Sequence, residues 1–174
     1  MINFASLASK EKIKIYCKPY NELTTFLMKK TYQQLPEIVG SNFQYANNFD
    51  KGLNYDLINK GHLILWDQPG TGFLECISSG IPSMVLWTRL FCEEENSCKK
   101  YFKKLEKSRI IHRTPQSLIK ELKIFLRDPV LWMNESTRKA IVNNFSSKYA
   151  LTNDNWQLVW RDYLKKIRKE VSEK

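Results

Sequence analysis

The chain has 174 residues, a length that suits one ordinary domain with a real hydrophobic core. Its high aromatic content (13%) and its few glycines and prolines exclude a disordered chain. The formal net charge of +10 fits a polyanionic partner, such as nucleic acid, an anionic lipid surface or a phosphate-bearing substrate. It fits equally a solvated basic surface with no specific partner.

Before the middle of the chain, hydrophobic patterning predicts short strands and helices. Residues before Lys10 show no clear pattern, and we expect a frayed start there. The expected elements are a strand at 12–16, a helix over 22–34 closed by Pro36, a short strand within 39–45, a turn at 47–50 and a short helix over 53–58.

The stretch 62–87 is typical of a βαβ unit. An apolar run at 63–66 predicts a buried strand, turn formers fill 67–72, and a short helix follows over 73–78 before a second apolar strand at 83–87. The turn presents free backbone N–H groups at a helix N-terminus, where a phosphate binds favourably.

Beyond this unit the pattern becomes mainly helical. The final helix repeats apolar residues at intervals of three and four, so one stripe of it must pack on something. The expected elements are a loop or helix start at 88–98, an amphipathic helix at 99–107, a last strand at 110–112, a helix beginning at Pro115, a break at Asp128, a helix over 132–145 and a final helix capped at 153–154.

Alternating strands and helices favour an α/β fold, in which an open parallel sheet carries helices on both faces. We find no internal repeat and no domain boundary. The sequence therefore predicts a single domain over 1–174, with a core at about 10–127 and a helical C-terminal tail over 128–174.

The cysteines and histidines do not form a metal-binding pattern. There is no CxxC pair, and the histidines lie far apart, so we expect no metal site. We expect Cys17 and Cys76 to be buried as small hydrophobic residues. No secretory leader opens the chain and no apolar run is long enough to span a membrane, which predicts a cytoplasmic protein with reduced thiols. The basic face also permits peripheral contact with a membrane surface.

A motif within the βαβ unit resembles the nucleotide-sugar half of GT-B glycosyltransferases. An acidic residue, Asp67, precedes a Gly-rich turn, and a second acidic residue, Glu75, precedes a turn with Gly80 and Pro82. The chain is more closely similar to transferases of bacterial surface-carbohydrate biosynthesis, from about Lys12 to about Tyr163. The residues that carry this similarity are Thr71, Leu74, Glu75, Gly80, Ile81, Pro82, the Lys-Pro-Tyr at 18–20, Ile111, His112, Asp128, Pro129 and Trp132.

The resemblance implies a Rossmann-like domain that is the C-terminal, donor-binding half of a two-domain enzyme. It implies a nucleotide-diphosphate sugar as donor, no cofactor, and a general base from an N-terminal Rossmann domain absent from this chain. Catalysis then requires both halves. The alternative is a non-catalytic GT-B-like remnant that acts as a binding or scaffold domain. Nucleic-acid binding rests on the net charge alone, and we recognise no motif for it.

Four residues of the turn and helix are candidates for nucleotide-sugar binding. Gly70, Thr71 and Gly72 are small enough to let a diphosphate approach the backbone, and Thr71 adds a hydroxyl donor. Glu75 is the candidate acceptor for ribose hydroxyls. The alternative readings are that the glycines only form a tight turn and that the Glu75 carboxylate only interacts with the helix dipole.

Two further candidates lie at strand ends. Asp67 follows the first strand of the βαβ unit, where it either meets the sugar or caps the turn. His112 lies at the carboxyl end of the last strand, the edge at which open parallel sheets bind ligands. No catalytic base can be assigned within the chain.

Overall fold

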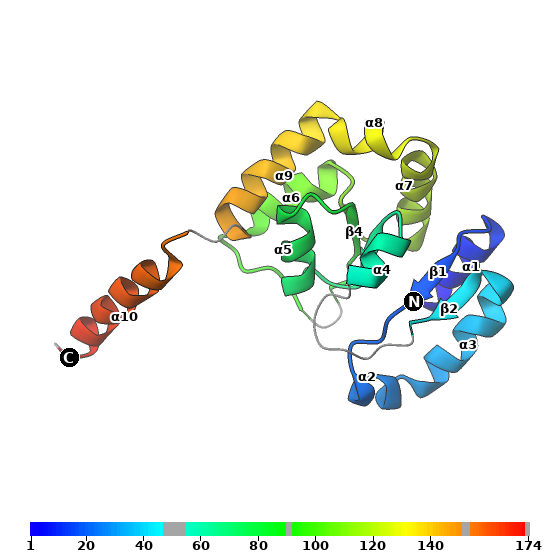
Figure 1. Ribbon diagram of the computed structural model, residues 1–174, viewed down its shortest axis with the longest axis horizontal. Coiled ribbons are helices and arrows are strands. Elements are labelled where there is room, and N and C mark those ends of the chain that lie inside the picture. Colours follow the sequence, from blue (N-terminus) through cyan, green and yellow to red (C-terminus); the bar gives the residue numbers. More distant parts are fainter. Residues whose placement is uncertain (47–54, 90–91, 151–153, 173–174) are drawn as a thin grey trace.

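The computed structural model describes residues 1–46, 55–89, 92–150 and 154–172, and it has an α/β fold with parallel strands (Figure 1). The strands are short: β1 (Ile15–Cys17), β2 (Phe43–Tyr45), β3 (Ile64–Trp66), β4 (Ser83–Leu86) and β5 (Ile111–His112). The helices are α1 (Ile2–Lys10), α2 (Glu22–Leu27), α3 (Lys29–Val39), the 3-10 turn η1 (Gly40–Asn42), α4 (Tyr55–Lys60), α5 (Thr71–Ser78), α6 (Lys99–Lys107), α7 (Pro115–Arg127), α8 (Pro129–Asn134), α9 (Ser136–Tyr149) and α10 (Trp156–Ser172).

The strands form two small parallel sheets. In the first, β1 pairs with β2; in the second, the order is β3-β4-β5. Trp66 of β3 pairs with Val85 of β4, and Val85 pairs with Ile111 of β5. Because α5 connects β3 to the parallel neighbour β4, the predicted βαβ unit is confirmed. The predicted Rossmann-like α/β fold with a helical C-terminal tail is confirmed as well, with its strands divided between two sheets.

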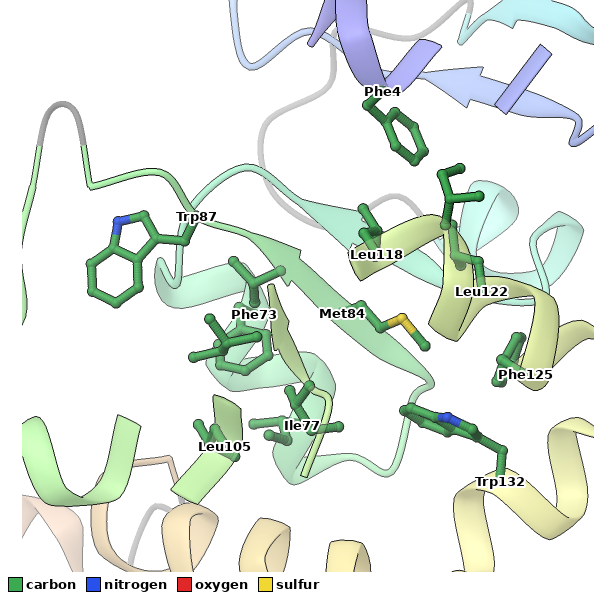
Figure 2. Packing of buried hydrophobic residues seen from close by; sticks show 14 of the residues in the cluster. Phe4, Phe73, Ile77, Met84, Trp87, Leu105, Leu118, Leu122, Phe125 and Trp132 are labelled. Carbon is green, nitrogen blue, oxygen red and sulfur yellow. The ribbon is translucent and has the colours of Figure 1, made fainter. Parts of the chain in front are cut away.

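The main hydrophobic core surrounds β4 (Figure 2). Met84 lies toward the α7 residues Leu122 and Phe125, while Phe73 of α5 lies on the other side of the strand. All four side chains are at most 6% exposed. Burial of this kind stabilises the fold by about 1.5–3 kcal/mol for each large apolar side chain. The core therefore fixes α5, and with it the Gly-rich turn, against the sheet.

The chain start forms a helix, which corrects the expectation of a frayed segment. Helix α1 packs on α3 and α7, and it buries Phe4, Ala5 and Ala8. Phe4 and Ala8 belong to the core around β4, whereas Ala5 belongs to a second core beneath β1 and β2. The amphipathic signal of this helix rests on two alanines and one large residue, and no side chain caps its N-terminus, so the sequence pattern is weak.

Proline 36 does not end a helix as expected, because it lies inside α3. A proline in a helix leaves the carbonyl four residues earlier without its N–H donor. Here that carbonyl belongs to Tyr32, and the hydroxyl group of Tyr45 in β2 donates to it. The predicted single helix over 22–34 is in fact α2 and α3, which meet at Met28.

The helix predicted over 132–145 is also divided in two. Glu135 lies between α8 and α9, and its carboxylate accepts hydrogen bonds from the backbone N–H groups of Thr137 and Arg138, at 2.9 and 2.8 Å. Glutamate is not a preferred N-cap residue, which is why the pattern does not reveal this break. Both helices return to the body of the protein, where α9 packs on α5 and α6.

Several remaining expectations concern single residues. Cys76 is buried as expected, whereas Cys17 is half-buried, and desolvation raises the pKa of its thiol to about 11. The turn expected at 47–50 and the cap residue Asn153 lie outside the described residues. Across the described helices, none is both long and apolar enough to cross a bilayer.

Candidate functional site

The carboxyl ends of β3, β4 and β5 meet at one edge of the second sheet, because the strands are parallel. Asp67 follows β3, Trp87 and Arg89 follow β4, and Arg113 follows β5. This is the edge at which open parallel sheets bind ligands. The Gly-rich turn that leads from β3 into α5 lies at the same edge.

The N-terminus of α5 has no side-chain cap. Gly70 is the N-cap residue, with φ −87° and ψ −172°, and the first helical hydrogen bond runs from the N–H of Leu74 to the Gly70 carbonyl at 3.2 Å. The preceding amides, at Thr71 and Gly72, therefore have no carbonyl of their own helix to bind. No acidic residue lies in the first turn. These N–H groups, with the positive end of the helix dipole, favour an anion.

The two glycines of the turn differ in their surroundings. A Cβ atom on Gly72 would collide with the indole of Trp66, lying only 2.8 Å from Cζ3, so packing inside the protein requires glycine there. A Cβ atom on Gly70 would meet nothing within 4 Å, and its backbone angles suit any residue. Open space thus lies beside the helix N-terminus at Gly70, while the indole of Trp66 occupies the space beside Gly72.

The predicted acidic residues and Thr71 are all exposed. Thr71 and Glu75 are four residues apart in α5, so they share one face of the helix. Asp67 lies at the entrance to the turn. Within the described part of the chain, the carboxylates of Asp67 and Glu75 form no hydrogen bond or ion pair. Both groups can therefore accept hydrogen bonds from a ligand without breaking a contact.

His112 is enclosed, with only 1% of its surface exposed. Its Nε2 lies 3.0 Å from the carbonyl oxygen of Arg109, so Nε2 carries the proton, and Nδ1 accepts from the Ser117 hydroxyl at 2.9 Å. Burial lowers the pKa of this imidazole. Both ring nitrogens are thus engaged inside the protein, and the side chain holds the end of β5 against the start of α7.

Two ion pairs that sequence reasoning did not find lie beyond the carboxyl ends of β4 and β5. Arg89 pairs with Glu94, whose side chain is 1% exposed, and Arg113 pairs with Glu106 at 3.2 Å. Both guanidinium groups lie over the Trp87 ring, with Cζ 5.6 and 4.7 Å from its centroid. Arg89 has φ 59°, a left-handed conformation that is uncommon outside glycine and clusters at functional sites.

Cys92, which lies between Arg89 and Glu94 in the sequence, contacts the Gly-rich turn. The thiol of Cys92, in the segment after β4, donates to Oε1 of Gln68 at 3.6 Å. Burial also leaves Nε of Arg89 and Oε2 of Glu94 without hydrogen-bond partners among the described residues. Arg113 follows the strand end at His112, so the rule that selected His112 also points to it. Nothing in the sequence marks Glu94 as the buried member of 93–95.

The described residues hold no group of three or more His, Cys, Asp or Glu side chains that could bind a metal ion. The fold and the edge just described place the protein among α/β proteins that present a helix N-terminus at the end of a parallel sheet. A family model of LIC12162 family transferases matches residues 2–164. The chain belongs to this family of transferases. No curated protein and no solved structure matches it.

Proposed function

We propose that this domain is the nucleotide-sugar-binding half of a glycosyltransferase-like enzyme of surface-carbohydrate biosynthesis. The observation that carries the proposal is the uncapped N-terminus of α5, which lies at the carboxyl edge of a parallel sheet with open space at Gly70. Membership of a transferase family supports a group-transfer reaction. The resemblance of the motif between Asp67 and Pro82 to GT-B enzymes supports a sugar nucleotide as the donor.

On this proposal, different residues of the turn and of α5 contact different parts of the donor. The diphosphate lies against the free amides at the start of α5, where they offset the charge that develops on the leaving group. The Thr71 hydroxyl donates to a phosphate oxygen, and the Glu75 carboxylate accepts from the ribose hydroxyls. Asp67, at the entrance to the turn, faces the sugar. His112 contributes indirectly, because it positions the strand end beside this site.

The reaction itself requires a second domain or subunit that faces the donor site. We infer that an N-terminal Rossmann domain or subunit supplies the general base that activates the acceptor hydroxyl, since GT-B-like enzymes place it there. The present domain then binds and orients the donor and stabilises the departing nucleoside diphosphate. Transfer forms the new bond from the anomeric carbon to the acceptor oxygen and breaks the bond to the diphosphate.

A thermal-shift panel of UDP, GDP, CDP and ADP sugars tests the proposal. We expect one base type to raise the melting temperature, because a ligand that binds only the folded state stabilises it. Glu75→Ala should weaken that shift. Glu37→Ala is the matched control, since Glu37 is also an exposed helical glutamate but lies on α3. Equal shifts in both variants would exclude Glu75 from the site.

A second variant separates binding from stability. Gly70→Ser adds an N-cap side chain to α5, which stabilises a helix by about 0.2–0.5 kcal/mol relative to glycine, and it fills the open space with a hydroxyl group. We expect a higher melting temperature without ligand and a smaller shift with the sugar nucleotide. No response of the parent protein to any nucleotide would instead favour the alternative, a non-catalytic GT-B-like remnant that acts as a scaffold.

A further inference from the structure

Helix α10 is exposed along its whole length. It has 17 residues, or about 25 Å at 1.5 Å per residue, and every side chain from Trp156 to Val171 is exposed. Figure 1 shows it lying apart from the rest of the protein. The stripe that the sequence requires to pack on something therefore packs on no described part of this chain, and it is open to a partner.

The two faces of α10 differ sharply in chemistry. At 100° per residue, one face carries aromatic and aliphatic side chains, and the edge-to-face rings of Trp160 and Tyr163 lie within it with centroids 6.0 Å apart. This apolar stripe comprises Trp156, Val159, Trp160, Tyr163, Leu164, Ile167 and Val171. The opposite face and its borders carry five basic residues and one acidic residue, Asp162, whereas the second acidic residue, Glu170, lies within the stripe, between Val159 and Tyr163 around the helix axis. The basic residues are Arg161, Lys165, Lys166, Arg168 and Lys169.

Charge decides between the occupants of the stripe. A second copy of α10 would bring a helix of the same positive charge alongside, in a chain whose net charge is already +10. An anionic bilayer offers the opposite charge, at about 1 kcal/mol for each basic residue near its surface. Indole and phenol rings are also the side chains that favour the level of the lipid headgroups.

We propose that α10 is an interfacial helix that lies in the surface of an anionic membrane, with its apolar stripe toward the acyl chains and its basic face toward the headgroups and water. A helix with an aromatic-rich apolar face and a lysine- and arginine-rich polar face binds in this way without spanning the bilayer. The inference rests on α10 alone, and it holds whether or not the turn at Gly70 binds a nucleotide.

Vesicle flotation of the full chain, without nucleotide, tests the proposal. We expect the protein to float with vesicles of equal parts phosphatidylcholine and phosphatidylglycerol at low salt. Vesicles of phosphatidylcholine alone should bind it at least about tenfold more weakly, because several basic residues lose their counter-charges. Molar salt should weaken binding to the anionic vesicles. Failure to float with anionic vesicles at low salt would overturn the proposal, as would equal binding to both lipids.

Two leucines on opposite faces of α10 provide a matched pair of variants. Leu164 belongs to the stripe and Leu158 to the basic face, and their exposures are similar at 56% and 48%. Leu164→Ser should weaken vesicle binding about tenfold, because it removes one buried leucine side chain from the lipid contact. Leu158→Ser should change it less than about twofold, since that side chain stays in water.

Equal effects of the two substitutions would show that the stripe does not face the lipid, and the proposal would be wrong. Neither leucine is buried, so both variants should keep the parental melting temperature, which confirms that the comparison is made between folded proteins. Sedimentation velocity tests whether a second copy of the chain occupies the stripe instead. A dimer that stays off vesicles and that Leu164→Ser dissociates would assign the stripe to a second copy and overturn the proposal.

Discussion

At the scale of single residues, the two glycines of the β3–α5 turn show why residue type alone does not define a binding site. Both suggested space for a ligand in the sequence. In the structure, the space at Gly72 is occupied by the indole of Trp66, whereas Gly70 faces open space. The absence of a side chain therefore has a packing cause at one position, and it leaves room for a ligand at the other.

This difference predicts unequal costs for the same substitution. Gly72→Ala should lower the free energy of unfolding by about 1–3 kcal/mol, because the new methyl group forces the Trp66 ring out of its position. Gly70→Ala should cost less than about 1 kcal/mol, the penalty for a poorer N-cap residue. Urea denaturation measures both. Equal losses would show that the Trp66 ring moves aside freely.

The enclosed imidazole of His112 predicts a pH dependence of stability. Burial lowers its pKa in the folded state below the ordinary value of 6.5, so below that pH the unfolded chain binds more protons. The free energy of unfolding should therefore fall as the pH drops below about 6.5, with a slope of at most about 1.4 kcal/mol per pH unit from this group.

The variant His112→Gln isolates this contribution. It removes the titrating ring but keeps an amide that can donate to the Arg109 carbonyl. Urea denaturation between about pH 7.5 and pH 5.5 should show a shallower dependence than in the parent protein, whatever the variant's absolute stability. An unchanged dependence would mean that His112 takes up a proton in the folded state as readily as in the unfolded chain.

At the scale of elements, the sequence predicts those whose signals are local. The basic amphipathic pattern at 99–107 coincides with α6, and the Thr114–Pro115 start of α7 is confirmed by the N–H of Ser117, which donates to the Thr114 hydroxyl at 3.2 Å. The elements that were missed depend on distant partners. Helix α1 is stable because it packs on α3 and α7, and Pro36 is tolerated because Tyr45 binds the carbonyl that it orphans.

The same distinction, between local signals and contacts with distant segments, applies to the candidate site. The turn, the helix N-terminus and the strand ends follow from patterns within a few residues of one another. Two other features arise only when separate segments pack together. Arg89 pairs with the buried Glu94, and the Trp66 ring occupies the space beside Gly72. Sequence spacing carries no record of such contacts, so the site's supporting residues emerge from the structure alone.

A buried ionic network fastens the helical tail to the core, and it predicts one sensitive residue. Arg138 of α9 pairs with Glu121 of α7 at 3.1 Å and donates to the Ser108 carbonyl at 3.0 Å, while the Trp132 indole N–H donates to the same Glu121 oxygen at 2.7 Å. The Arg138 guanidinium also stacks on Trp132, with Cζ 3.9 Å from the ring centroid.

Removing the arginine leaves Glu121 buried without its cation. Arg138→Ala should therefore lower the free energy of unfolding by about 3–5 kcal/mol. Its neighbour Lys139 is exposed, and Lys139→Ala should cost less than about 0.5 kcal/mol. Thermal and urea unfolding of the two variants compare them directly. A small effect at Arg138 would mean that water reaches Glu121 and replaces the ion pair.

At the scale of the whole molecule, the structure separates the helices that belong to the core from the one that does not. Phe145 of α9 is 2% exposed, and its ring lies 5.4 Å from that of Phe102 and 6.5 Å from that of Phe73. The helices of the tail predicted over 128–174 differ in their packing. Helices α8 and α9 complete the fold, and α10 presents an exposed amphipathic surface.

Two truncations test this division. A chain ending at residue 154 loses α10 alone, and its free energy of unfolding should stay within about 0.5 kcal/mol of the parent, because no described side chain from Trp156 onward is buried. A chain ending at residue 144 also loses Phe145 and should be destabilised by at least about 3 kcal/mol. The chain ending at residue 154 should remain folded but should not float with anionic vesicles. If this chain were destabilised as much as the one ending at residue 144, α10 would pack on the core in solution, and its stripe would not be available to a membrane.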